Sequence, residues 1–154
     1  MKYFYPKIFI SLSLLFAVIS CSSPPPTVVK TPSYSVISQG QQSGFTLQKV
    51  LIIESTGEFN ELWAIHTGGS KTPTPIINFK SSVVVANFLG EQPTGGYSIK
   101  VNKVVYTEKY TQIIFSTHRP TPGSMRTMQI TQPYIMIKID KTKKPIYFEY
   151  NREN

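Results

Sequence analysis

The 154-residue sequence contains one cysteine, Cys21, and only two histidines, His66 and His118. Disulfide bonds within the chain are therefore excluded. Zinc sites use three or four protein ligands, and two scattered histidines do not supply such a set. A nucleophile triad needs a base beside Ser, Thr or Cys, and neither histidine lies in a recognisable motif of that kind. These absences predict a protein with no catalytic residues, no metal site and no small-molecule cofactor.

Acidic residues are scarce, since eight Asp and Glu oppose sixteen Lys and Arg, for a net charge of +8. The acids are dispersed, so no carboxylate pair indicates glycosidase chemistry. Gly95-Gly96 lacks the Lys-Ser/Thr continuation of a phosphate loop. Four lysines cluster near the end of the chain: Lys138, Lys141, Lys143 and Lys144. We interpret them as residues that keep exposed strand edges from pairing with other chains. Contact with an anionic membrane or an acidic partner is the alternative, and we expect no nucleic-acid partner.

The one long apolar run, Ile8 to Ile19, is too short to span ~30 Å of hydrocarbon. Two lysines precede it and Ser20-Cys21 follows it, which is the order of a secretory signal. The pattern resembles a bacterial lipoprotein signal, so we expect residues 1–20 to be cleaved and Cys21 to carry lipid. An ordinary cleavable signal with an incidental cysteine is the alternative. The expected location is the bacterial cell envelope, at the outer membrane, facing the periplasm or the cell surface.

Residues 21–44 are rich in proline, serine, glutamine and glycine. Such a segment cannot form a core, and its prolines favour an extended chain. We predict a lipid anchor and tether over residues 21–44 and a globular domain over residues 45–154. Within the tether, Tyr34 to Ile37 is a candidate edge strand.

A short helix is predicted from Glu58 to His66. Ser55 and Glu58 have the spacing of a capping box, and Phe59, Leu62 and Trp63 fall on one helical face. We expect that face to pack on a sheet. His66 would then lie at the helix end, where its charge suits the helix dipole.

Strands account for most of the remaining chain, which is rich in Val, Ile, Phe and Tyr. Ser82 to Leu89 is nearly continuously apolar, as in a strand buried on both faces. Gly90 to Gly96 predicts a tight hairpin loop, and the change of alternation after Asn102-Lys103 predicts a β-bulge. Residues 140–145 would turn the chain into a final strand. The expected fold is α+β, mostly β: an antiparallel five- or six-stranded sheet, or an open barrel-like sandwich, with one short helix packed on it.

Several segments together resemble the PrcB C-terminal domain family. They are Phe59 to Trp63, Pro75 to Phe79, Val83 to Gly90, Pro93 to Ile99, Pro120 to Gly123 and Pro133-Tyr134, in that order. The resemblance runs from about Lys49 to Asp140. The family is named for an accessory lipoprotein of a bacterial surface protease complex. The resemblance implies a domain that binds and stabilises a protease, such as a subtilisin-like protease, and is not itself a hydrolase.

The loops at the ends of a rigid sheet are the usual place for binding residues. We predict a partner-contact site formed by Pro93, Thr94, Gly95, Gly96, Tyr97, Arg119 and Pro120. A glycine pair lets another chain approach closely, and a tyrosine adds contact area at low entropy cost. Alternatively, the loop only closes its hairpin and Tyr97 packs inward.

Two further functions stay open. Gln92 to Tyr97 and Arg119-Pro120 look like two loops of the chagasin inhibitors of papain-like proteases, whose glycine-rich middle loop is missing here. A chagasin-like protease inhibitor is therefore the alternative function. A carbohydrate-binding role would need a row of exposed aromatic residues, which Tyr134, Tyr147 and Tyr150 permit.

Overall fold

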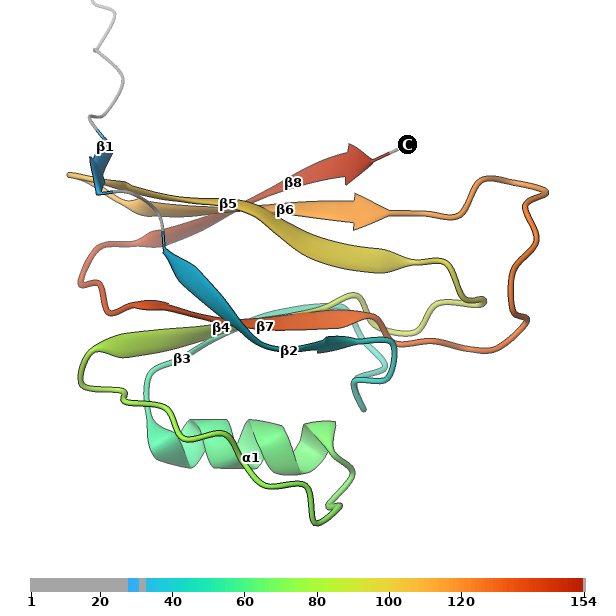
Figure 1. Ribbon diagram of the computed structural model, residues 1–154, viewed down its shortest axis with the longest axis horizontal. Helices are drawn as coiled ribbons and strands as arrows, with labels where there is room; N and C mark the ends of the chain where they lie inside the picture. The colour runs from blue at the N-terminus through green and yellow to red at the C-terminus, as the bar shows by residue number, and fades with distance from the viewer. Residues whose placement is uncertain (1–27, 31–32, 154) are drawn as a thin grey trace, which may run out of the picture.

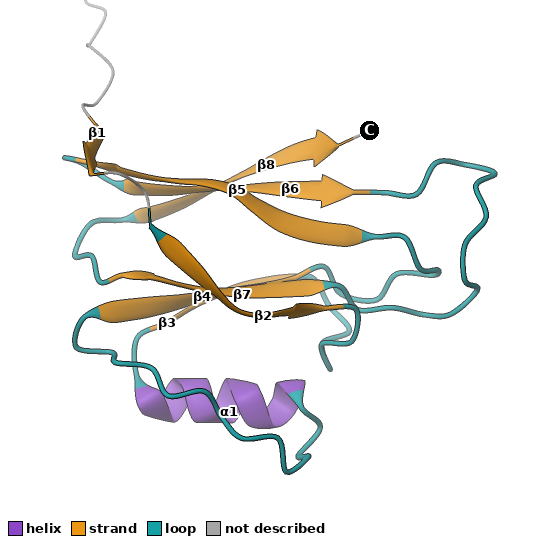
Figure 2. Cartoon of the chain, viewed as in Figure 1, coloured by secondary structure: helices purple, strands orange, loops and turns teal. Residues whose placement is uncertain are grey.

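The computed structural model describes residues 28–30 and 33–153, so the expected leader and Cys21 lie outside the described residues. In this part of the chain, two four-stranded sheets and one helix form three layers (Figure 1, Figure 2). The outer sheet has the strand order β1-β5-β6-β8, and the central sheet has the order β2-β7-β4-β3. The elements are β1 (Val28–Lys30), β2 (Tyr34–Gly40), β3 (Lys49–Ile53), α1 (Thr56–His66), β4 (Ser82–Phe88), β5 (Ser98–Thr107), β6 (Thr111–His118), β7 (Tyr134–Asp140) and β8 (Ile146–Glu153).

The central sheet is covered on both faces, which explains the continuous apolar character of its inner strands. Every residue of β4 is buried, as predicted for a central strand. Residues between the two sheets form one core: Val83, Val85, Ile99, Val101, Val104, Tyr106, Ile113, Phe115, Ile135, Ile137 and Ile139. Residues between the central sheet and the helix form the other: Ile53, Phe59, Leu62, Trp63, Phe79, Val84, Ala86, Phe88, Tyr134 and Met136.

Helix α1 begins with the predicted capping box. The Ser55 hydroxyl accepts the Glu58 N–H at 3.3 Å, and the Glu58 carboxylate accepts the Ser55 N–H at 3.1 Å. Phe59, Leu62 and Trp63 are buried against the central sheet, as expected. The Trp63 indole N–H donates to the Thr72 carbonyl at 3.3 Å, so its polar atom is satisfied at the edge of the core.

The β5–β6 hairpin confirms the predicted bulge. The antiparallel register of these strands shifts between Val101 and Lys103, where the alternation of the sequence changes. The extra residue, Asn102, accepts a hydrogen bond of 2.6 Å from the Ser116 hydroxyl. The bulge therefore keeps Val101 and Val104 on the buried face despite the odd spacing.

The hairpin predicted at Gly90 to Gly96 is wrong. Strand β4 pairs with β3 and β7 in the central sheet, whereas β5 lies in the outer sheet. The segment is therefore a crossover between sheets. Gly90 and Gly96 have φ values of 71° and 90°, so the glycines serve the reversal of the chain as expected. Turn residues show that the chain changes direction, but they do not show which strand it joins.

The connection from β7 to β8 also crosses between sheets, so the last turn is not a hairpin within one sheet. Strand β8 pairs with β6 in parallel, from Thr111–Ile146 to His118–Glu153. The expected all-antiparallel arrangement is thus corrected at this edge. The apolar side chains of β8 find their partners in β6, which lies far from β8 in sequence, and local patterning carries no information on that pairing.

The tether predicted over residues 21–44 overlaps two strands. Strand β2 pairs with β7 along the edge of the central sheet, from Tyr34–Ile139 to Gly40–Tyr134. Ser43 is fully buried, and the Ser43 carbonyl lies 3.1 Å from Nδ1 of His66 at the helix end. The folded part therefore begins before residue 45. Strand β2 looks polar in sequence because an edge strand buries little of its side-chain surface.

The mostly β fold with one short helix is confirmed. Of the two architectures expected, the chain adopts the open sandwich, with eight strands in the described residues where five or six were predicted. No helix in this described part is long and apolar enough to cross a membrane.

Candidate binding recess at one end of the sandwich

The layer between the two sheets changes from apolar to polar towards one end. Along β4, Val83 and Val85 face the outer sheet and Asn87 follows on the same face. Opposite it, Tyr150 of β8 stacks on Phe115 with ring centroids 5.6 Å apart. The Asn87 amide nitrogen donates to the Tyr150 hydroxyl at 2.9 Å. This hydrogen bond lies where the apolar core ends.

Beside this pair the structure forms a recess of about 360 Å³. It is lined by residues from the ends of β6 and β8, from the start of β3 and from the two long loops: Gln48, Leu89, Gln92, Tyr97, Thr117, His118, Arg119, Tyr150 and Arg152. Thr117 and Arg152 are direct partners in the β6–β8 ladder, so their positions are fixed by the sheet. The sheet thus fixes one wall of the recess, and the two loops form the rest.

The recess is basic. Arg119 and Arg152 are its charged residues, and no Asp or Glu is found among its described lining residues. Within the described part of the chain, neither guanidinium group has a hydrogen-bond or ion-pair partner. Burial raises the pKa of the Tyr150 hydroxyl, and the hydrogen bond from Asn87 partly offsets this shift. Tyr150 therefore remains a neutral hydroxyl at physiological pH.

The predicted partner-contact residues lie around this recess, but they do not all face it. Tyr97 and Arg119 line it. Pro93 is exposed on the same loop. Thr94 is only 8% exposed, and its carbonyl accepts a hydrogen bond of 2.9 Å from the Thr131 hydroxyl.

The glycine pair makes a close approach to its own chain. The Gly95 N–H donates to the Thr127 carbonyl at 3.0 Å, and a Cβ at Gly95 would collide with the Thr127 hydroxyl. A Cβ at Gly96 would lie 3.0 Å from Pro120. These contacts join the loop of residues 89–97 to the loop of residues 119–133. The two glycines thus let the second loop of the same domain approach closely, where we expected a partner chain. Their role in partner contact stays a prediction.

Sequence reasoning missed Gln48 and Arg152 as members of a site. It considered Tyr150 only as part of a row of exposed aromatic residues for carbohydrate binding, and Tyr134 of that row is buried. Asn87 was the available signal, because it is a polar residue within an otherwise apolar, fully buried strand. Arg152 gave none, since its position depends on the parallel pairing of β8 with β6.

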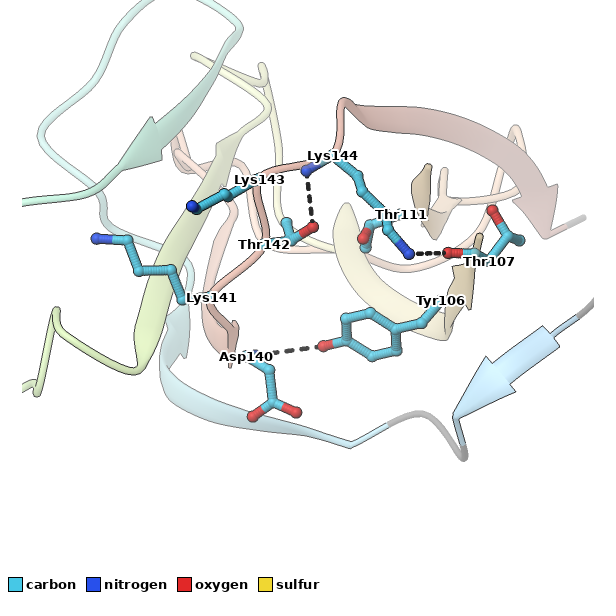
Figure 3. Close-up of a pocket in the computed structure, with 8 residues that line it drawn as sticks. All are labelled: Tyr106, Thr107, Thr111, Asp140, Lys141, Thr142, Lys143 and Lys144. Atoms are coloured by element: carbon cyan, nitrogen blue, oxygen red, sulfur yellow. Dashed lines mark hydrogen bonds between the residues drawn. The ribbon is translucent and has the colours of Figure 1, made fainter. Parts of the chain in front are cut away.

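Three of the lysines near the end of the chain, Lys141, Lys143 and Lys144, line a second hollow (Figure 3). They belong to the β7–β8 connection, which lies at the opposite end of the sandwich (Figure 1). The Lys141 ammonium donates to the Phe79 carbonyl at 2.9 Å, and the Lys144 ammonium donates to the Thr107 carbonyl at 2.7 Å. The Asp140 N–H donates to the Tyr106 hydroxyl at 3.3 Å. Two of the clustered lysines therefore bind the β7–β8 connection to the segment before β4 and to the end of β5, instead of only covering an edge.

The two histidines lie apart. The His66 ring packs on Tyr134, with centroids 4.5 Å apart, whereas His118 lines the recess. In the part of the chain that the structure describes, no group of three or more His, Cys, Asp or Glu residues could hold a metal ion.

The fold and the recess define a β-sandwich domain with a basic hollow at one end. Residues 83–140, from β4 to β7, match the model of the family described as PrcB C-terminal. This match confirms the resemblance found in the sequence; the segment from Lys49 to Ser82 lies outside the matched range. No curated protein and no solved structure shows significant similarity to the chain.

Proposed function

We propose that the protein is a lipid-anchored accessory subunit of the cell envelope, which binds and stabilises a secreted or surface protease. The observation that carries this proposal is the basic recess, since it gathers predicted contact residues at the end of a family domain. The family takes its name from an accessory protein of a protease complex, and this supports a protein partner, such as a subtilisin-like protease.

The anchor is the second part of the proposal. Cys21 would carry the lipid, and the segment before β1 would connect it to the sandwich. The chain enters the described fold at the end that carries the clustered lysines (Figure 1). An anchor there would leave the recess at the far end, directed away from the membrane. Mass spectrometry of the Cys21 peptide tests this part, because an unmodified thiol would contradict it.

Cross-linking in the native envelope, followed by purification of the lipoprotein, tests the protease partner. We expect a secreted or surface protease among the cross-linked proteins. In cells lacking the lipoprotein, we expect that protease to be degraded faster, because an accessory subunit stabilises its precursor. If the protease is absent from the cross-linked material and keeps its abundance in those cells, the accessory function is contradicted.

A chagasin-like inhibitor is the second candidate, and one observation favours it. The two loops that resemble inhibitor loops lie side by side, with Gly96 against Pro120. However, Thr94 and Gly95 are buried beneath the second loop, which reduces the surface that the first loop offers to a protease cleft. Inhibition assays against papain-like and subtilisin-like proteases test the alternative. Absence of inhibition across both classes would exclude it.

A further inference from the structure

The two arginines of the recess carry positive charge that the described protein does not neutralise. Arg119 follows strand β6, and Arg152 lies on β8 opposite Thr117. Both are exposed and without a partner in the described residues. A guanidinium group offers its donors in a fixed fork that matches two oxygen atoms of one anionic group. The recess thus presents donors for an acceptor that must come from another molecule.

The inner wall of the recess adds a neutral donor. Because the Asn87 amide nitrogen donates to the Tyr150 oxygen, the Tyr150 proton is not used in that hydrogen bond. It remains available to an acceptor in the recess. Asn87 is fully buried, and its amide oxygen has no partner in the described residues. A buried polar group with an unsatisfied atom is unfavourable and calls for an explanation. Orienting the Tyr150 hydroxyl towards the recess is such an explanation for Asn87.

The size and the remaining lining suit part of a polypeptide. About 360 Å³ accommodates one side chain or the last residue of a chain. The Gln48 amide has no other hydrogen bond in the described residues and offers both donors and an acceptor, as a peptide group requires. Gln48 also lies immediately before β3, an edge strand of the central sheet. A polypeptide ligand is therefore favoured over a free inorganic anion.

We propose that the recess binds a carboxylate group of a polypeptide partner, held by Arg119 and Arg152 and by the hydroxyl of Tyr150. This inference rests on the proposed function, and it specifies which chemical group of the partner enters the recess. The carboxylate has two possible sources, an acidic side chain or the C-terminus of the partner chain.

The sequence provides a direct spectroscopic test, because it contains only three arginines: Arg119, Arg126 and Arg152. The full chain is labelled with ¹⁵N-arginine, solubilised in detergent, and observed through its three Nε–Hε signals. Arg126 does not line the recess and serves as the internal control. Four probes are titrated: Ac-Ala-Glu-Ala-NH₂, Ac-Ala-Ala-Ala-OH, Ac-Ala-Gln-Ala-NH₂ and inorganic phosphate.

We expect saturable shifts of the Arg119 and Arg152 signals with at least one carboxylate peptide, and an unmoved Arg126 signal. Shifts with the first peptide alone identify a side-chain carboxylate, and shifts with the second alone identify a C-terminus. Equal shifts with the glutamine peptide, shifts with phosphate alone, or no saturation with any probe would each overturn the proposal.

Two variants separate binding from folding. Arg152→Gln is expected to weaken carboxylate binding about tenfold or more, as for a lost charge-assisted hydrogen bond. Tyr150→Phe keeps the ring and removes only the donor, and we expect weaker binding with an unchanged circular dichroism spectrum. Arg126→Gln is the matched control and should bind as the original chain does. Unchanged binding in both recess variants contradicts the assignment.

Failure of the carboxylate assignment can be distinguished from failure of the proposed accessory function. If Arg152→Gln captures the protease as well as the original chain does, the accessory function stands and the carboxylate assignment fails. If the carboxylate peptides bind but no protease is captured, the recess chemistry stands and the protease partner is wrong.

Discussion

Asn87 of β4 and Tyr150 of β8 are joined by a 2.9 Å hydrogen bond across the layer between the two sheets. Asn87 is fully buried, and its oxygen is unsatisfied in the described residues. Val83 and Val85, on the same face of β4, show that an apolar residue suits this layer. The pair therefore positions a hydroxyl at the recess, at a point where the layer between the sheets is otherwise apolar.

Asn87→Val should leave the free energy of unfolding unchanged or raise it by up to ~1 kcal/mol, because it removes an unsatisfied buried oxygen. Urea denaturation measures this. Asn87→Asp is the opposite variant and should cost at least ~2 kcal/mol, because it places an ionisable group in the core. A loss of more than ~2 kcal/mol in Asn87→Val would show that the asparagine is needed for folding.

The hydroxyl of Tyr150 should make the original chain and the Tyr150→Phe variant differ in stability at alkaline pH. Burial raises the pKa of its hydroxyl above the ordinary value. The folded state then holds this proton more tightly than the unfolded state does, so its contribution is present below the unfolded pKa and is lost as the pH rises through the folded pKa. Compared with Tyr150→Phe, the original chain should lose stability faster above about pH 10. Parallel pH profiles for the two proteins would contradict the raised pKa.

Glu58 predicts a difference in acid stability. The backbone N–H groups of Glu54 and Ser55 donate to the Glu58 carboxylate. The hydrogen bond from Glu54, together with the side chain and backbone of Ser55, lowers the pKa of Glu58. Its contribution is therefore present above the unfolded pKa and is lost as the pH falls through the lowered folded pKa. Glu58→Gln should flatten the stability profile below about pH 5. Glu61→Gln, on the same helix but outside the capping box, is the control for the loss of one negative charge.

Gly95 and Thr127 should be energetically coupled. A Cβ at position 95 would meet the Thr127 hydroxyl, so Gly95→Ala should cost ~1–3 kcal/mol of folding free energy. Thr127→Ala removes that hydroxyl, and the double variant should regain most of the loss. Gly57→Ala is the control, because a Cβ there meets nothing within 4 Å. Additive effects of the two changes in a urea-denaturation cycle would contradict the contact.

Local features of this fold were predictable because their causes are local. The capping box of Ser55 and Glu58 fixes the helix start, and the bulge at Asn102 follows from a change of alternation. Strand pairing was not predictable in the same way. The turn residues at Gly90 to Gly96 show a reversal, but the choice between a hairpin and a crossover depends on contacts with distant strands.

The site was predictable to a similar extent. Loop composition indicated Tyr97 and Arg119, which line the recess. It also predicted Thr94 and Gly95 as contact residues, but both are buried by the second loop. Arg152 enters the site only because β8 pairs in parallel with β6, a relationship between segments that the sequence pattern does not encode.

Site-specific photo-cross-linking in the native envelope compares the two ends of the sandwich. A photoreactive residue is placed at Pro93, beside the recess, and in a separate protein at Lys143, in the β7–β8 connection at the opposite end (Figure 1). The proposed function predicts that the Pro93 position cross-links to a protease and that the Lys143 position does not. Protease cross-links from Lys143 alone, or from neither position, would contradict partner binding at the recess.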